Sequence, residues 1–258
     1  MQEIQKEESA TSLAGRTVLV TGGARRIGAE IVRHLHACGA SVVIHYHRSA
    51  AEAQALAAEL ETRRHGSTLL HCADLLDTER LPELVAATTA RFGSLDILVN
   101  SASTFYPTPF GSITAPQWAD LMGTNLKAPL FLAQAAASYL RRSQGLLINI
   151  ADIHGLRPLR DYSVYSTAKA GLIQLTRALA RELAPEVRVN AIAPGPVMWP
   201  EAAAERDAAH QQQIIDRTLL KRAGSPADVA RAVRFFAIDA PYITGQILAV
   251  DGGRSLGW

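Results

Sequence analysis

Short runs of β-branched residues alternate along the chain with longer segments of helical periodicity, and this alternation constrains the fold more than any other feature. Between the first two runs, Ile27, Ile31, Leu35 and Cys38 recur at the three- or four-residue spacing of an amphipathic helix. Strand–helix alternation implies right-handed crossovers and a parallel sheet covered on both faces. We therefore expect a single doubly wound α/β domain whose seven strands are RTVLV, SVVIHYH, STLLH, SLDILVN, GLLINI, EVRVNAI and QILAV.

Length and composition narrow the class of protein. The chain has 258 residues, enough for the core of one large α/β domain, and a formal net charge of +2. No dense basic run suggests a nucleic-acid partner, and charges interrupt every apolar stretch before it reaches membrane-spanning length. Cys38 and Cys72 share no metal-ligand spacing, so we expect buried, reduced thiols and no metal site.

The N-terminal segment MQEIQKEESATS is polar and lacks the apolar core of a secretory signal. We expect residues 1–14 to form a flexible leader and residues 15–258 to form the domain. A cytoplasmic location fits these features.

The first predicted strand runs into TGGARRIG, residues Thr21 to Gly28, and then into the first predicted helix. Glycines permit a tight turn and close backbone approach, and a helix N-terminus offers free N–H groups and a positive dipole to a pyrophosphate. This strand–turn–helix context favours a dinucleotide site of the Rossmann type at the carboxyl ends of the strands. The alternative is an ordinary strand-to-helix turn.

The end of the second predicted strand favours NADPH over NADH. An NAD site commonly has an acidic residue here for the ribose 2′-hydroxyl, whereas this chain has His45, Tyr46, His47, Arg48 and Ser49. Arg48 can bind a 2′-phosphate through charge-assisted hydrogen bonds, and Ser49 can add a donor. Alternatively, these residues form a solvated loop in which Ser49 caps the following helix.

Polar residues also follow the third and fourth predicted strands. The carboxylate of Asp74 can accept a hydrogen bond from the adenine amino group, or it can cap the helix expected near residues 78–92. Asn100 and Ala102 would border the coenzyme.

Tyr165 and Lys169 stand four residues apart in YSTAK, on one face of a predicted helix. A free tyrosine has a pKa of about 10 and holds its proton too tightly for catalysis near neutrality, and a nearby ammonium lowers that pKa. The lysine can also donate hydrogen bonds to the nicotinamide ribose. Such a pair alone is commonly only a helix surface, so its meaning depends on the other motifs.

Those motifs resemble, in their order, the short-chain dehydrogenases/reductases over nearly the whole chain after the leader. TGGARRIG is followed by Asn100-Ser101-Ala102-Ser103, Asn125, the Tyr165–Lys169 pair and Pro194-Gly195. The resemblance implies that Tyr165 exchanges the proton, that Lys169 assists it, and that Asn125 holds a water in a proton relay. It also implies a coenzyme site formed by Gly22, Arg26, Ile27, Gly28, His45, Tyr46, His47, Arg48, Ser49, Asp74, Leu75, Asn100, Ala102, Ser103, Tyr165, Lys169, Pro194 and Gly195.

Two departures from the common pattern resemble the pteridine reductase subgroup. Arg26 replaces the usual second glycine of the first loop, and Asp152 replaces the usual serine after the fifth strand. HYHRSAAEA, STFYPTP, YITG and VDGG also resemble that subgroup, whereas Ser101 stands where Asn is commoner. The resemblance implies a homotetramer and a pterin site lined by Arg26, Ser103, Phe105, Asp152 and Tyr165, with Tyr162 and Met198 or Trp199 as further candidates.

Asp152 and Phe105 carry the substrate prediction. A carboxylate repels a developing oxyanion but can accept hydrogen bonds from the ring nitrogens and amino group of a pterin, and it can bond Tyr165 and pass it a proton. Alternatively, Asp152 caps a turn and the enzyme is inactive or altered. Phe105 is expected to stack on the flat ring or, alternatively, to anchor a proline-rich loop in the core.

These features predict an NADPH-dependent enzyme that reduces a pterin or folate ring, with Tyr165 protonating the nitrogen beside the carbon that receives the hydride. The segment near residues 197–218 is expected to cover the substrate as a flap. Two alternatives stay open: reduction of a ketone, acyl thioester or quinone, and non-catalytic regulation through bound NADPH. Asp152 argues against the first, and the complete set of Tyr165, Lys169 and Asn125 argues against the second.

Overall fold

The computed structural model describes residues 12–199 and 208–257, and it confirms the predicted parallel α/β fold. All strand pairs in the single sheet are parallel, in the order β3-β2-β1-β4-β5-β6-β7. The strand order reverses between β1 and β4, so their carboxyl ends open the crevice in which such sheets bind ligands. The strands are β1 (Thr17–Val20), β2 (Ser41–Tyr46), β3 (Thr68–Cys72), β4 (Ile97–Asn100), β5 (Leu146–Ile150), β6 (Arg188–Pro194) and β7 (Ile247–Val250).

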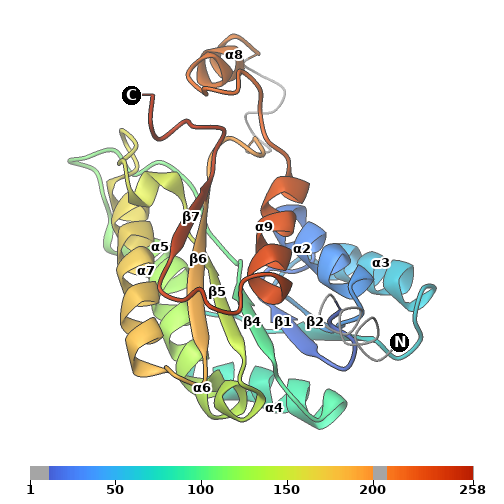
Figure 1. Cartoon of the computed structure of the whole chain (residues 1–258). Helices are drawn as coiled ribbons and strands as arrows, with labels where there is room; N and C mark the ends of the chain where they lie inside the picture. Colours follow the sequence, from blue (N-terminus) through green and yellow to red (C-terminus); the bar gives the residue numbers. More distant parts are fainter. Residues whose placement is uncertain (1–11, 200–207, 258) are drawn as a thin grey trace.

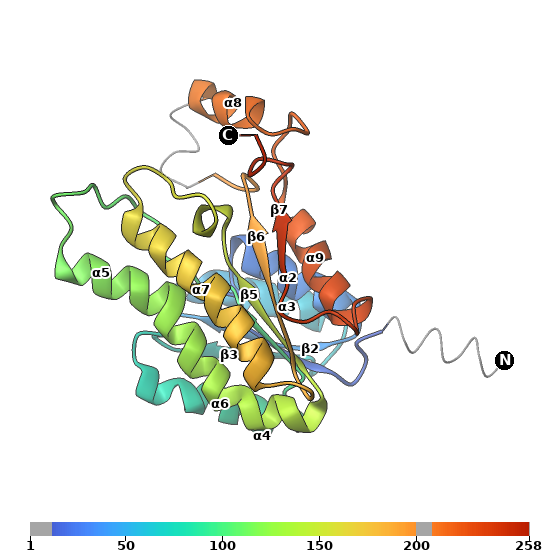
Figure 2. The ribbon, with the colours of Figure 1, turned by 60° about the vertical axis from the view of Figure 1, so that its left-hand side comes forward.

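Helices cover both faces of the sheet (Figure 1). One layer holds α2 (Arg26–Ala37), α3 (Ala50–Glu61) and α9 (Pro226–Ile238). The other holds α4 (Leu81–Phe92), α6 (Ala128–Ser143) and α7 (Ser163–Glu182), with α5 (Ala115–Met122) joined to α6 by a π-helical turn, Gly123–Lys127. Short 3₁₀ turns lie at Thr78–Arg80 and Ile153–Gly155. Figure 2 shows α8 (Ala208–Asp216) apart from both layers, beyond the ends of β6 and β7.

Alternation of side chains along each strand divides the core between the two faces. In β1, Val18 and Val20 pack with the layer of α2, α3 and α9, whereas Leu19 packs with the layer of α4, α6 and α7. All three side chains are completely buried. Because a central parallel strand is buried on both faces, its sequence is an unbroken apolar run, as the pattern predicts.

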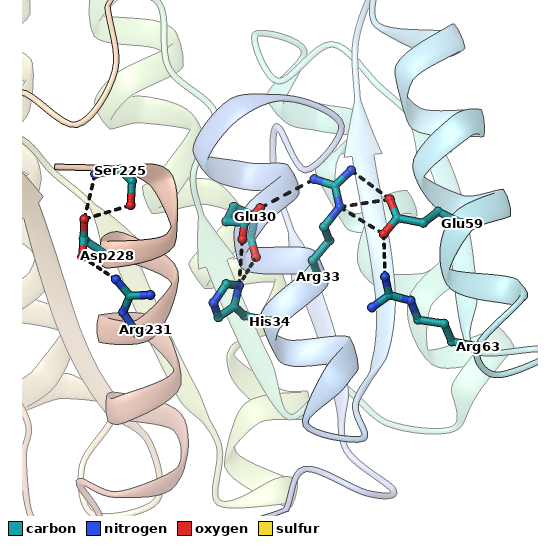
Figure 3. A network of polar contacts seen from close by, with 8 residues as sticks. All are labelled: Glu30, Arg33, His34, Glu59, Arg63, Ser225, Asp228 and Arg231. Carbon is teal, nitrogen blue, oxygen red and sulfur yellow. Dashed lines mark hydrogen bonds and ion pairs between the residues drawn. The ribbon is translucent and has the colours of Figure 1, made fainter. Parts of the chain in front are cut away.

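The solvent side of the first layer is polar (Figure 3). Arg33 on α2 forms an ion pair with Glu59 on α3 at 2.9 Å, and Glu59 also binds Arg63 at 3.2 Å. On α9, Asp228 accepts hydrogen bonds from Ser225 and completes a capping box. Exposed ion pairs contribute little to stability, so the apolar face of each helix provides most of its attachment to the sheet.

The structure bears on three expectations about the chain and changes two of them. Of the predicted leader, residues 1–11 lie outside the described part, but Leu13 is only 4% exposed and packs in the core. Both cysteines are free, yet Cys38 is only half-buried and Cys72 is exposed, so the prediction of buried thiols is wrong. Among the described residues, no helix is long and apolar enough to cross a membrane.

Candidate active site

The glycine-rich turn after β1 brings two strand ends into close contact. Gly22 has a φ of +61°, and a Cβ atom there would lie 2.9 Å from the Cα of Ala102, which follows β4. A Cβ on Gly28 would lie 2.1 Å from the carbonyl oxygen of Gly22. Both positions therefore require glycine, because a side chain at either position would collide with the protein's own backbone. Gly195, after β6, is equally constrained, because a Cβ there would lie 2.6 Å from the Cβ of Asp251.

Arg26 occupies a backbone conformation that favours glycine. It begins α2 with a φ of +54°, which explains why a glycine is commoner at this point of the loop. Its guanidinium lies 2.8 Å from the Sδ of Met198 and donates to the carbonyl oxygen of Trp199 at 3.0 Å. The side chain thus extends from the glycine-rich turn to the segment after β6, where we predicted substrate contacts.

The predicted coenzyme contacts at the end of β2 differ in their exposure. His47 and Arg48 are exposed, and Ser49 is the N-cap of α3 but its hydroxyl makes no capping hydrogen bond. His45 is only 2% exposed, and both ring nitrogens lie within hydrogen-bonding distance of backbone atoms. The predicted ribose contacts are therefore available from His47, Arg48 and Ser49, while the side chain of His45 is occupied inside the protein.

Asp74 does not cap the helix that follows it. Its Oδ1 accepts a hydrogen bond from the N–H of Leu76 at 3.0 Å and forms a local turn, whereas α4 has Arg80 as its N-cap. Its other oxygen, Oδ2, lies 4.0 Å from Nε2 of His47. The helix-capping alternative is thus wrong, and an oxygen of Asp74 faces the same turn as the predicted 2′-phosphate contacts.

Several predicted coenzyme contacts have side chains directed into the protein. Asn100 is 4% exposed and donates a hydrogen bond to the Oδ1 of Asn149 at 2.9 Å. Leu75 is buried in the core beside α4 and α6, and Tyr46 and Ile27 pack against the opposite core. These residues can border a ligand only through their backbone or an edge of the side chain, because they belong to the core.

The catalytic candidates from β5 and α7 converge. Tyr165 Oη donates a hydrogen bond to Oδ2 of Asp152 at 2.8 Å, while Oδ1 of Asp152 accepts from the N–H of His154 at 2.7 Å. Lys169 Nζ lies 5.7 Å from the centre of the Tyr165 ring and donates to the carbonyl oxygen of Ile150 at 3.0 Å. Asp152 is therefore a turn cap and a partner of Tyr165 at once, through different oxygens.

The pKa of Tyr165 shifts opposite to our expectation. Burial and the nearby Asp152 carboxylate raise the pKa of Tyr165 well above its usual value, although a hydrogen bond with Ser103 acts in the other direction. Burial also lowers the pKa of Lys169 to about 8, against the attraction of Asp152. Tyr165 is thus held as a protonated phenol, which is the form required of a proton donor in a reduction.

Asn125 lies in the π-helical turn between α5 and α6 and is completely buried. Its Nδ2 donates to the carbonyl oxygens of Leu121 and Thr104, at 2.9 and 3.0 Å, and its Oδ1 accepts from Ser103 Oγ at 2.6 Å. π-Helical turns interrupt helices frequently at functional sites. The turn connects Asn125, through Ser103, to the phenol of Tyr165.

Aromatic rings form the wall beside this centre. Phe105 stacks on Tyr162, with ring centres 4.6 Å apart, and meets Tyr165 edge-on at 4.8 Å. Phe105 is 39% exposed, so it is not a core anchor, and that alternative is wrong. Its loop is instead anchored by Tyr106, whose hydroxyl donates to Asp120 on α5 at 2.8 Å.

Thr21 is a residue of the candidate site that the sequence analysis did not single out. It is 2% exposed, and its Oγ1 accepts hydrogen bonds from the N–H groups of Ser101 and Ala102, at 3.0 and 3.1 Å. These bonds tie the glycine-rich turn to the end of β4. Its place at the head of TGGARRIG was a usable signal, because a hydroxyl at the end of a buried strand needs a partner.

The residues present fit a nicotinamide dinucleotide. The glycine-rich turn leads into α2, whose first turn has neither an acidic residue nor a side-chain cap, and such a helix N-terminus suits an anionic pyrophosphate. Arg48 is exposed in the turn after β2, where we predicted the adenosine end, and Tyr165 and Lys169 lie on α7, where we predicted the nicotinamide end. Among the described residues, no group of three His, Cys, Asp or Glu side chains could hold a metal ion.

The parallel sheet, the glycine-rich turn and the Tyr165–Lys169 pair define a nicotinamide-dependent oxidoreductase, and the chain belongs to the short-chain dehydrogenase/reductase family. A family model described as enoyl-(acyl carrier protein) reductase matches residues 22–255. Pteridine reductase 1 of Leishmania tarentolae is 36% identical, covering 95% of this chain and 98% of the relative. A 3-oxoacyl-[acyl-carrier-protein] reductase of Synechocystis sp. is 34% identical, covering 94% and 98%. One from Staphylococcus aureus is also 34% identical, covering 92% and 97%.

Proposed function

We propose that this reductase uses NADPH to reduce the ring of a pterin or a folate. The observation that carries the proposal is the hydrogen bond of 2.8 Å between Tyr165 Oη and the carboxylate of Asp152. A carboxylate beside the proton donor disfavours a substrate that develops an oxyanion there. It favours a substrate that presents N–H groups, as the pyrimidine part of a pterin does.

The geometry supports a division of work among the residues of the site. The coenzyme supplies the hydride when bound. Tyr165 donates its phenolic proton to the ring nitrogen beside the reduced carbon. Asp152 takes up a proton from solvent and passes it to the Tyr165 phenolate along their hydrogen bond, which restores both groups. Lys169 provides positive charge, and Ser103 links the phenol to Asn125. Phe105 offers a flat, partly exposed face on which a heteroaromatic ring can stack.

The choice of NADPH is supported by the turn after β2. Arg48 is exposed at the end of this strand, and the hydroxyl of Ser49 makes no capping hydrogen bond. No carboxylate follows in the segment from His45 to Ser49, so nothing within it repels a 2′-phosphate.

A second candidate is reduction of a 3-oxoacyl thioester, favoured by the names of two relatives that are 34% identical. The carbonyl oxygen of such a substrate gains negative charge during hydride transfer, and it then needs hydrogen-bond donors. Asp152 supplies an acceptor at this position, so we place this candidate second.

A substrate panel with one variant distinguishes the two candidates. NADPH oxidation is followed with dihydrobiopterin, dihydromonapterin, dihydrofolate and acetoacetyl-coenzyme A, for the native protein and for Asp152→Ser. We expect the native protein to reduce a pterin or folate and the variant to lose that activity. Turnover of only the thioester by the native protein would overturn the proposal in favour of the second candidate.

We further propose a homotetramer in the cytoplasm. Trp118 on α5 is 50% exposed and Leu130 on α6 is 38% exposed, and such apolar side chains on neighbouring helices suit a subunit interface. Light scattering combined with size-exclusion chromatography tests this oligomeric state.

The proposed substrate flap includes residues 200–207, which lie outside the described part, and α8, which lies beyond the sheet.

A further inference from the structure

The buried ring of His45 has one defined protonation state. Its Nδ1 lies 3.1 Å from the backbone nitrogen of Gly22, and its Nε2 lies 3.1 Å from the carbonyl oxygen of Ala73. A backbone N–H can only donate and a carbonyl can only accept, so Nδ1 carries no hydrogen and Nε2 carries one. The imidazole is therefore neutral and in a single tautomer.

The two partners of this ring belong to different turns, and His45 itself lies near the end of β2. Gly22 lies in the glycine-rich turn after β1, and Ala73 lies between β3 and Asp74. The carbonyl oxygen of His45 itself accepts a hydrogen bond from the N–H of Gly23 at 2.9 Å. His45 thus connects the turns that we expect to hold the pyrophosphate, the 2′-phosphate and the adenine.

We propose that His45 is a positioning residue for the coenzyme, which holds the glycine-rich turn against the ends of β2 and β3 through the acceptor at Nδ1 without touching the coenzyme itself. On the other side, Thr21 ties the same turn to β4 through the N–H groups of Ser101 and Ala102. The turn is therefore fixed from both neighbouring strands. The proposal rests on the coenzyme site described above and is independent of the substrate.

The neutral state of His45 is a condition for this role. A proton on Nδ1 would point at the N–H of Gly22 and break the hydrogen bond. Burial lowers the pKa of His45 to about 4, and the neighbouring His71 and His47 lower this pKa further, while the bond to Ala73 and the charge of Asp74 raise it. The ring therefore stays neutral at neutral pH.

Two substitutions separate the two hydrogen bonds of the ring. In His45→Asn, the side-chain oxygen can replace Nδ1 as acceptor toward Gly22. In His45→Gln, the side-chain nitrogen can replace Nε2 as donor toward Ala73, but no acceptor remains near Gly22. The control is His71→Asn, because His71 pairs with His45 in register on β3 and has no hydrogen bond to the turn in the described part of the chain.

The measurement is the dissociation constant of NADP⁺ by calorimetry at pH 7.5, with thermal unfolding of each variant alongside. We expect His45→Asn and the control to bind within about threefold of the native protein, and His45→Gln to bind at least about tenfold more weakly. Equal affinities in both His45 variants, whether native-like or reduced, would overturn the role of Nδ1.

The dependence of NADP⁺ binding on pH below neutrality gives a second test, which does not require His45→Gln to fold. Between pH 7 and pH 4, the dissociation constant of NADP⁺ should rise about twofold more for the native protein and the control than for His45→Asn, because about half of the His45 rings carry a proton at their pKa of about 4. The difference isolates His45, because the native protein and His45→Asn share every other ionisable group and bind the same ligand. Identical slopes would contradict the proposal.

Discussion

The two ends of the candidate coenzyme site differ in the interactions that shape them. At the nucleotide end, glycine conformations and neutral hydrogen bonds from Thr21 and His45 determine the shape of the turn. At the proton-transfer end, Asp152, Tyr165 and Lys169 lie close together, and the carboxylate of Asp152 raises the pKa of Tyr165 and opposes the lowering of the pKa of Lys169 by burial. A region that holds a ligand needs fixed geometry, whereas a region that moves a proton needs interacting ionisable groups. Substitutions at one end should therefore leave the function of the other intact.

The largest expected effect is on proton transfer. Tyr165→Phe removes the phenolic proton without changing the ring that packs against Phe105. We expect kcat with the preferred substrate to fall about 10³-fold while the affinity for NADPH stays within about twofold, because proton donation contributes this much in comparable enzymes. Stopped-flow absorbance and fluorescence titration measure the two quantities. A matching loss of NADPH affinity would show that the two ends are not separable.

Asp152→Asn should sharpen the comparison through its pH dependence. We expect kcat/KM for a dihydropterin to fall about 10²-fold, because the amide cannot relay a proton from solvent to the Tyr165 phenolate. The carboxylate raises the pKa of both Tyr165 and Lys169, so its removal lowers both. In the native protein, activity should decline above about pH 8 as Lys169 loses its charge. In the variant, this decline should begin at lower pH. If activity declines at the same pH in both proteins, Asp152 does not influence the charge of Lys169.

Arg48→Ala tests the nucleotide end alone. We expect the dissociation constant of NADPH to rise at least about tenfold, since a charge-assisted hydrogen bond contributes about 1.5–3 kcal/mol. The dissociation constant of NADH should change by less than about twofold, because NADH lacks the 2′-phosphate. Isothermal titration with both coenzymes measures the difference. A similar weakening of both would mean that Arg48 acts on the shape of the turn instead.

The smallest effect concerns the strained backbone at Arg26, whose φ is +54°. Arg26→Gly and Arg26→Ala both remove the contacts with Met198 and Trp199, but only glycine suits the left-handed conformation. We expect the free energy of unfolding of the glycine variant to exceed that of the alanine variant by about 1 kcal/mol. Urea denaturation of the two variants measures this difference, and equal stabilities would show that the turn relaxes when the side chain is removed.

Sequence reasoning predicted the elements and the chemistry-bearing residues well where the signal is local. All seven predicted runs form strands of one parallel sheet. The signal is strongest for the inner strands, because a strand buried on both faces needs an unbroken apolar run. Tyr165 and Lys169 lie on one helix, so their spacing alone determines that they share a face. The positions of Asp152 and Asn125 in the order of motifs were enough to bring them into the candidate site.

Contacts between distant parts of the chain decided the rest. His45 and Asn100 were expected to face the coenzyme, but their partners Gly22, Ala73 and Asn149 lie 23 to 49 residues away and hold both side chains inside. The direction of the Tyr165 pKa shift likewise depends on burial and on where the carboxylate of Asp152 lies. By itself, the sequence determined the strands, the helices and the residue types available for chemistry. Only the tertiary structure decided which of those side chains are buried, paired or charged, because burial and electrostatic interactions depend on distances that spacing along the chain does not specify.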